Sequence, residues 1–353
     1  MQQEASGIPL NRKPRIQGLD SIRFICAVWV AMCHHLDPPI LTLVPEGPLA
    51  GKLFHGVYNN IWNGPAAVIV FFVISGFCIH YPFAGSNKSP HLLEFYTRRS
   101  LRILVPLLAI LSVAMFTGTK LIHFNTGILW SLICELIYYA IYPALLTLRL
   151  RHRSWLPALT VSFFASLWLA STNPGAGNYP SFGFGLNWLL GLPCWLLGCQ
   201  LAEWVSRSDC AQRKKIGNIW KWRFGVLFAA WVASAMRFHT PIGYPWTLNF
   251  FGILATCWLL QEIIHRETKA PSKRLETAGL ASYTLYLIHV PAHDFVYNLS
   301  KAHFTDINPW LYWILSMLIL FASCILFYLI IEKPSHLLAR YLGGQIRKRA
   351  LNG

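Results

Sequence analysis

The feature that most constrains this chain is a series of apolar segments, each about as long as a bilayer-spanning helix. Short polar connections separate ten such segments, which run over about 17–36, 62–83, 103–122, 128–148, 155–171, 186–205, 224–240, 247–264, 279–297 and 310–331. Only 12% of the 353 residues are charged, about half the share of a soluble domain. The sequence therefore predicts an all-α integral membrane protein, a bundle of about ten transmembrane helices.

The basic residues between these segments indicate how the helices cross the membrane. If the N-terminus is cytoplasmic, 25 of the 30 Lys and Arg residues lie on the cytoplasmic side, four lie on the other side, and Arg23 lies inside the first segment. Basic residues concentrate in the cytoplasmic loops of multispanning proteins. We therefore expect both termini in the cytoplasm and no cleaved signal. We expect one domain over 1–345 and a basic cytoplasmic tail over 346–353.

Composition also excludes several partners. The net charge of +16 comes from short basic clusters between apolar segments, so it indicates membrane topology and no nucleic-acid partner. The nine Cys include no Cys-x-x-Cys pair, and most lie in apolar segments, where a thiol behaves as a small hydrophobic group. We expect no metal site and no disulfide framework. The oligomeric state stays open.

The first segment carries ionisable residues, which are costly in lipid and usually face a cavity. Arg23 and His34 are eleven residues apart, so on a regular helix they differ by about 20° and lie about 16 Å apart along the axis. Asp20 lies near the same face, whereas His35 points about 120° away. This spacing favours His34 as the partner of Arg23 in a common cleft. Alternatively, Arg23 reaches the cytoplasmic surface and the histidines cap the outer end.

Two further segments carry polar residues on one face. Ser131 and Glu135 share a face of the fourth segment, and a carboxylate at that depth needs a cation, a donor or a proton. Glu135 either meets His34 in one cavity or forms a structural ion pair. In the ninth segment, residues 282, 286, 289 and 293 align within about 40°. This stripe either lines a sugar-sized cavity or hydrogen-bonds neighbouring helices.

Two shorter motifs complete the set. Arg98 and Arg102 share a helix face at the cytoplasmic start of the third segment. They either anchor the helix at lipid headgroups or clamp a phosphate, since Arg pairs with phosphate oxygens through two hydrogen bonds. Ser75-Gly76, inside the apolar run Phe71–Phe77, favours close helix packing over chemistry.

Taken together, these motifs resemble the acyltransferase-3 family of bacterial membrane acyltransferases, in the family's order and over nearly the whole chain. The matching segments are Gly18 to Arg23 with His34, Phe71 to Phe77, Arg98-Arg99 with Arg102, Trp130-Ser131-Leu132 with Glu135, Ser282-Tyr283 with Tyr286-Leu287 and His289, and Glu332-Lys333-Pro334. Ser21 departs from the family, which commonly has Gly there. Leu136 and Ile137 also depart, because a second Glu or Gln often follows the family's Glu.

The resemblance implies an O-acyltransferase of the bacterial inner membrane. Such enzymes move an acyl group, most commonly acetyl, from cytoplasmic acyl-CoA to a hydroxyl of a cell-surface saccharide or its lipid-linked precursor. It implies catalytic roles for His34 and Glu135, with Glu135 or Asp37 orienting the imidazole. It implies acyl-CoA binding by Arg23, Arg98, Arg99 and Arg102, and substrate binding by Ser131, Trp130, Tyr286 and His289. Acyl-CoA is then a substrate, and no cofactor is bound permanently. Without the fused periplasmic domain of some members, the chain is expected to act alone or with a separate partner.

A second class of function stays open. Transporters also place His, Glu and Arg at midmembrane, so the bundle is alternatively an exporter or flippase for a polysaccharide or lipid-linked sugar, without acyl chemistry. The sequence has neither half-to-half symmetry nor a pair of Gly/Pro-broken helices to support that alternative. Dependence on acyl-CoA separates the two functions.

Overall fold

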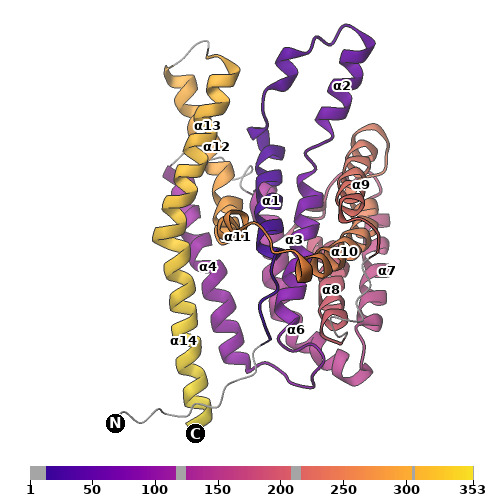
Figure 1. The fold of residues 1–353 in the computed structure, drawn as a ribbon, viewed down its shortest axis with the longest axis vertical. Helices are drawn as coiled ribbons and strands as arrows, with labels where there is room; N and C mark the ends of the chain where they lie inside the picture. The colour runs from indigo at the N-terminus through magenta and orange to yellow at the C-terminus, as the bar shows by residue number, and fades with distance from the viewer. Residues whose placement is uncertain (1–12, 117–124, 208–215, 304–306, 353) are drawn as a thin grey trace.

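The computed structural model of the chain describes residues 13–116, 125–207, 216–303 and 307–352. These residues form helices and short connections, and no β-strand occurs among them, which confirms the all-α prediction (Figure 1). The α-helices are α1 (Leu19–Ala31), α2 (Leu49–Asn59), α3 (Gly64–His80), α4 (Leu92–Phe116), α6 (Trp130–His152), α7 (Leu156–Thr172), α8 (Gly183–Arg207), α9 (Ile219–His239), α10 (Tyr244–Thr268), α11 (Lys273–Gly279), α12 (Ser282–His303), α13 (Pro309–Phe327) and α14 (Lys333–Asn352). Turns of 3₁₀-helix cover Ile40–Leu43 and Tyr179–Phe182, and π-helical turns cover Met32–Leu36, Asn125–Leu129 and Tyr328–Glu332.

All ten predicted segments coincide with helices, although residues 117–122 of the third lie outside the described residues. Among the described residues, six helical stretches are long and apolar enough to cross a membrane. They are Leu49–His80, Leu92–Phe116, Gly127–His152, Tyr179–Arg207, Tyr244–Thr268 and Pro309–Ala350. The chain therefore has the helices of a membrane protein, while the ten-span count and the cytoplasmic termini stay predictions.

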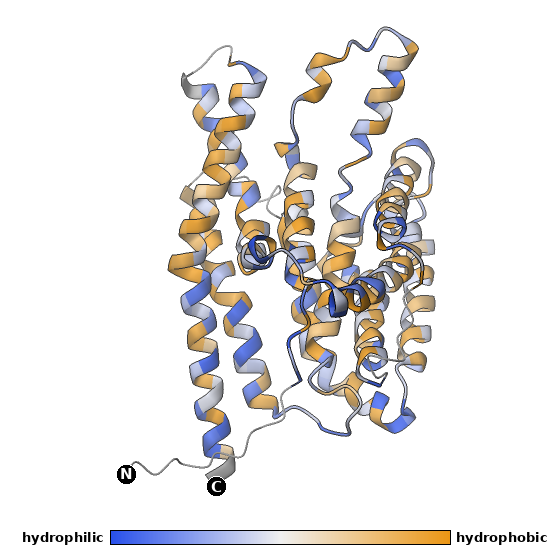
Figure 2. Ribbon diagram, in the orientation of Figure 1, coloured by the Kyte–Doolittle hydropathy of each residue, from blue (hydrophilic) through white to orange (hydrophobic). Residues whose placement is uncertain are grey.

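The apolar segments do not predict α2, α11 and α14, because mixed polar and apolar residues hide these helices from a search for apolar runs. Lys333–Asn352 continues α13 after a π-helical turn and includes the residues expected to form the tail. α14 packs along α4, and both helices are rich in hydrophilic residues toward the lower end of the view (Figure 2). This pairing supplies one wall of the candidate site.

Capping residues explain where several helices begin. Asn63 accepts a hydrogen bond from the backbone N–H of Ala66, and Pro65 follows within the first turn of α3. The Asn308 side chain accepts hydrogen bonds from two backbone N–H groups at the start of α13. An Asn cap satisfies amides that lack helical partners, and Pro lacks the amide that would need one.

α3 is the central helix, and it packs against α8 through glycines. A Cβ atom added to Gly76 would lie 1.9 Å from the carbonyl oxygen of Trp195, and one added to Gly198 would lie 2.0 Å from that of Val73. The two backbones are therefore in direct contact. This confirms the interpretation of Gly76 as a close-packing position.

A buried ionic network, which the sequence analysis missed, ties the ends of α3, α6 and α8 together. Glu203 Oε1 lies 2.7 Å from His80 Nε2 and 2.5 Å from an Arg149 guanidinium nitrogen. The backbone N–H of Gly85 donates to the other carboxylate oxygen at 3.2 Å. Because the Glu203 carboxylate is almost fully buried, these partners replace the water that it loses.

Candidate functional site

A cavity of about 660 Å³ is lined by residues of α1, α3 and α6 and by residues of α4, α12 and α14. Its volume is typical of a pocket that binds a small molecule or cofactor. Its lining is strongly basic where α1, α4 and α14 approach one another. Elsewhere the lining combines apolar side chains with hydroxyls and one carboxylate from α3, α6 and α12.

The basic part of the lining consists of Arg15, Arg23, Arg99, Arg102, Lys333 and Arg340. Asp20 neutralises part of this charge: it accepts a hydrogen bond from Arg15, and its carboxylate lies 3.8 Å from Arg23. Glu332 accepts hydrogen bonds from the backbone N–H and the hydroxyl of Thr284. Because basic groups outnumber carboxylates here, this part of the cavity attracts anions.

The arginines of the third predicted segment divide between two environments. Arg99 and Arg102 line the cavity, whereas Arg98 does not. A guanidinium nitrogen of Arg98 lies 2.9 Å from Glu94 Oε1, and the Arg98 side chain packs beside Gly343 of α14. The two arginines that line the cavity, Arg99 and Arg102, are therefore three residues apart in the sequence. Arg98 packs against α14 instead.

Glu135 and Ser131 both line the cavity, as their four-residue spacing predicts. The Ser75 hydroxyl donates to Glu135 Oε1 at 2.7 Å, and the Tyr139 hydroxyl donates to the same oxygen. The Arg99 guanidinium lies over the Tyr139 ring, 5.9 Å from its centre. Residues of α3 and α6 thus hold this carboxylate at the cavity wall, and Arg99 of α4 packs on one of them.

Two hydroxyl groups meet where α6 and α12 face the cavity. Ser131 Oγ lies 2.6 Å from the Tyr286 hydroxyl and 3.1 Å from the Ile128 carbonyl oxygen. Since the carbonyl only accepts, Ser131 donates to it and Tyr286 donates to Ser131. The Phe71 ring packs edge-on against Tyr286, with ring centres 5.9 Å apart. These contacts close one end of the cavity.

His34 lies beside this closed end, and it contacts α12 without lining the cavity. Its Nδ1 lies 2.9 Å from the Val30 carbonyl oxygen and 3.2 Å from Nε2 of the fully buried His289. A Cβ added to Gly127 would lie 3.4 Å from His34 Nε2, which is an ordinary van der Waals distance, so this nitrogen lies next to the turn that precedes α6. In a neutral ring, donation to Val30 makes Nε2 the basic nitrogen.

Arg23 and His34 share a helical segment, but the regular helix assumed from the sequence is interrupted between them. Met32–Leu36 forms a π-helical turn that contains His34. The angular spacing of a regular α-helix therefore does not give the direction of the His34 side chain. Arg23 and Asp20 line the cavity, and His34 contacts His289 instead. The sequence thus places Arg23 and His34 in one helical segment, while the π-helical turn sets the direction of the His34 side chain.

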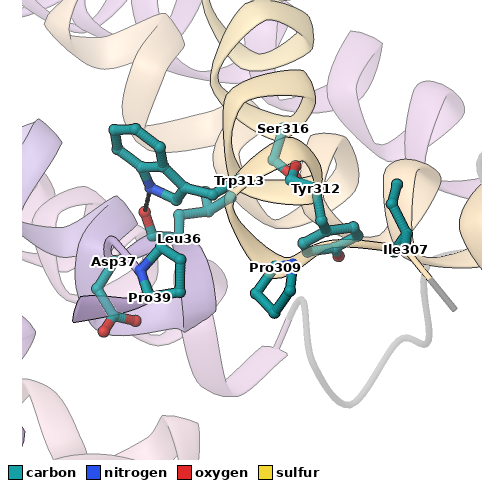
Figure 3. A pocket seen from close by; sticks show the side chains of 8 residues that line it. All are labelled: Leu36, Asp37, Pro39, Ile307, Pro309, Tyr312, Trp313 and Ser316. Atoms are coloured by element: carbon teal, nitrogen blue, oxygen red, sulfur yellow. Dashed lines mark hydrogen bonds between the residues drawn. The ribbon is translucent and has the colours of Figure 1, made fainter. Parts of the chain in front are cut away.

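Trp130 and Asp37 also lie outside the cavity lining. Trp130 is buried, and its ring packs edge-on against Phe72 and Tyr179. Asp37 lines a separate pocket of about 350 Å³ beside α13, where the Trp313 indole N–H donates to the Leu36 carbonyl at 3.0 Å (Figure 3). Asp37 thus lies at the edge of this separate pocket, with its carboxylate pointing away from Pro309 and Tyr312 (Figure 3).

The structure adds site residues that the sequence analysis did not select. Ser75 and Tyr139 hold Glu135, and only the second had a local signal, its four-residue distance from Glu135. Residues 332, 336 and 340 line the cavity at helical spacing, a signal visible in the sequence beside the closing Glu-x-Pro motif.

Ser21, the departure noted near the start of α1, has a partner of its own. Its backbone N–H and hydroxyl both donate to Glu276 Oε1 of α11, at 2.9 and 2.6 Å. Glu276 therefore caps the first turn of α1 and holds α11 against it.

Comparison with known proteins gives one match. A family model described as an acyltransferase domain, that of the acyltransferase-3 family, matches residues 16–329. Neither the curated proteins nor the solved structures give a match. The matched range includes the cavity lining except for Arg15, Glu332 and the residues on α14. The chain therefore belongs to the acyltransferase-3 family.

Proposed function

We propose that the chain transfers an acyl group, most simply acetyl, from acyl-CoA to a hydroxyl of a cell-surface saccharide or its lipid-linked precursor. One observation carries this proposal: a single cavity has six basic residues in its lining and a closed end formed by the hydroxyls of Ser131 and Tyr286. The family match supports acyl transfer as the reaction class. We place the protein in the bacterial inner membrane, with both termini in the cytoplasm.

The basic part of the cavity suits the phosphates of CoA. Arg23 comes from α1, and Arg99 and Arg102 come from α4, so guanidinium groups approach from two helices. Each pairs well with phosphate oxygens, and the surrounding protein strengthens the attraction relative to water. The pantetheine arm then extends past apolar residues to place the thioester near Ser131.

The neighbouring groups supply the chemistry of transfer. His34 Nε2 accepts the proton of the saccharide hydroxyl as the hydroxyl oxygen bonds to the thioester carbonyl carbon. The carbon–sulfur bond breaks, and the CoA thiolate takes the proton from His34. The Tyr286 hydroxyl turns from Ser131 and donates to the thioester carbonyl oxygen as negative charge develops on it, while Ser131 keeps its hydrogen bond to Ile128. Glu135, which lines the cavity one turn of α6 from Ser131, hydrogen-bonds the saccharide.

The surroundings of the alternative nucleophiles favour direct transfer. The Ser131 hydroxyl donates to a backbone carbonyl, which is not a base that deprotonates it. Cys134 is fully buried, and its thiol donates to the Asn187 side-chain oxygen at 3.3 Å. Among the described residues, the hydrogen-bond partners of these two side chains include no base of the kind that an acyl-enzyme route needs.

Replacing His34 with Gln tests the proposed base. We expect a stable protein whose kcat falls by about 10²-fold or more, because Gln fills similar space without accepting a proton. Mass spectrometry of surface glycans from cells with wild type, His34→Gln or neither should show an acyl increment only with wild type. Turnover of acyl-CoA by the purified proteins gives kcat.

Near-normal transfer by a folded His34→Gln protein would exclude His34 as the base. If well-expressed wild type adds no acyl group, turns over no acyl-CoA and alters glycan export, the protein is a transporter and the proposed function fails.

A further inference from the structure

His289 contacts His34, and the reaction proposed above gives this contact no role. Its side chain is fully buried within α12, and both ring nitrogens have partners inside the protein. Nδ1 lies 2.7 Å from the Tyr286 carbonyl oxygen, and Nε2 lies 3.2 Å from His34 Nδ1. The family resemblance implies that His289 binds substrate, but His289 is absent from the cavity lining.

These contacts determine where the protons lie. A carbonyl oxygen only accepts, so Nδ1 of His289 carries a hydrogen, and Nε2 of the neutral ring is an acceptor. His34 Nδ1 must then be the donor to His289. The Val30 carbonyl, 2.9 Å from the same atom, independently requires that hydrogen. Both observations assign one tautomer to His34, with its basic lone pair on Nε2.

A protonated His289 would disrupt this arrangement. Its Nε2–H would face the Nδ1–H of His34, and the added positive charge would lie in a fully buried side chain. Burial of a charge without an anionic partner is costly. The neutral ring is therefore the form that fits both hydrogen bonds.

We propose that His289 is a positioning residue for the acyl transfer proposed above, on which this inference rests. It holds the imidazole of His34 in the orientation that directs Nε2 toward the saccharide hydroxyl. When Nε2 takes up the proton of that hydroxyl, the Nδ1 hydrogen stays on His34 and donates to His289 and Val30. The neutral acceptor thus stabilises the imidazolium until its Nε2 proton passes to the CoA thiolate.

Three substitutions at this position separate positioning from packing. Gln extends far enough to accept a hydrogen bond where Nε2 lies, whereas Asn reaches only the region of Nδ1, and Leu fills space without an acceptor. We expect kcat to fall by about 10²-fold for His289→Leu and His289→Asn, while His289→Gln recovers to within about tenfold of wild type. KM for acyl-CoA should stay near the wild-type value in all three, because the basic part of the cavity is untouched.

The experiment uses the full-length protein in detergent, with acyl-CoA turnover for kcat and KM and thermal unfolding to confirm folding. A matched control is His80→Leu, which removes another fully buried histidine from the network around Glu203. This control should lower thermal stability and leave the kcat of the folded fraction close to wild type.

The outcomes distinguish the inference from the function on which it rests. The order Gln above Asn and Leu in kcat, at constant KM, supports positioning by His289. A folded His289→Leu protein with wild-type kcat overturns the inference, and so do equal losses for all three variants. If His34→Gln keeps normal activity, the proposed base itself is wrong. An inactive His34→Gln beside a normal His289→Leu rejects only the role of His289.

Discussion

At the scale of single residues, the three arginines of one motif at the start of α4 lie in two different environments. Arg98, Arg99 and Arg102 lie within about one helical turn, yet only the last two line the cavity. Arg98 pairs with Glu94 on the side that α14 covers. One motif therefore contains two residues placed to bind a ligand and one placed to hold two helices together.

This division predicts different kinetic effects for neighbouring substitutions. We expect Arg102→Gln to raise KM for acyl-CoA about tenfold or more, because a charge-assisted hydrogen bond is worth about 1.5–3 kcal/mol. Arg98→Gln should change KM by less than about threefold, since Arg98 does not line the cavity and pairs with Glu94 on its own helix. Steady-state kinetics at fixed ionic strength measures both, and equal effects would contradict the assignment.

At the scale of helices, contact between α3 and α8 depends on the absence of side chains. Gly198 faces the Val73 carbonyl, and Gly76 faces the Trp195 carbonyl. Backbone atoms cannot move aside as the end of a flexible side chain can. The same pair of helices carries Ser75 and the buried Glu203, so their spacing positions the wall of the cavity that holds Glu135.

Two alanine substitutions in α8 test this contact. Gly198→Ala places a Cβ about 2.0 Å from a carbonyl oxygen, so we expect destabilisation by about 1–3 kcal/mol and a clear fall in Tm. Gly185→Ala meets open space in the same helix, and its Tm should stay equal or rise slightly because Ala favours helix. Thermal unfolding in detergent compares them. An unchanged Tm for Gly198→Ala would show that the helices can separate without cost.

At the scale of the whole molecule, the segment before α1 and the C-terminal part of α14 lie at one end, and α2 lies at the other (Figure 1). The basic residues predict that this first end is cytoplasmic. The basic part of the cavity then faces the compartment that holds acyl-CoA, while His34 lies farther along the chain's first crossing.

Reporter fusions test this orientation. We expect a fluorescent protein fused after the C-terminus or at Arg153 to be active, and alkaline phosphatase to be active only when fused near Gly47 or Gly175. These positions lie in connections assigned to opposite sides by the distribution of Lys and Arg. Phosphatase activity at the C-terminus would reverse the topology, and two active phosphatase fusions on adjacent connections would contradict the ten-span count.

Much of the fold follows from local patterns. An apolar run such as 186–205 reveals a helix because its side chains must leave water wherever the rest of the chain lies, and α8 covers that run. α11 and α14 escape the same search because their apolar and polar residues are mixed. Ser131 and Glu135 reach one cavity wall because four residues make about one turn of a regular helix.

The sequence by itself determined the ten apolar helical segments, the membrane class, the family and three of the six basic residues in the cavity lining, since each depends on residues close together in the chain or on a short motif. Only the tertiary structure decided that Glu135 meets Ser75 and that His34 meets His289. These partners lie 60 and 255 residues apart, so their contacts depend on how helices pack. The π-helical turn that contains His34 is likewise hidden from the sequence, because it rotates a side chain without changing the apolar pattern.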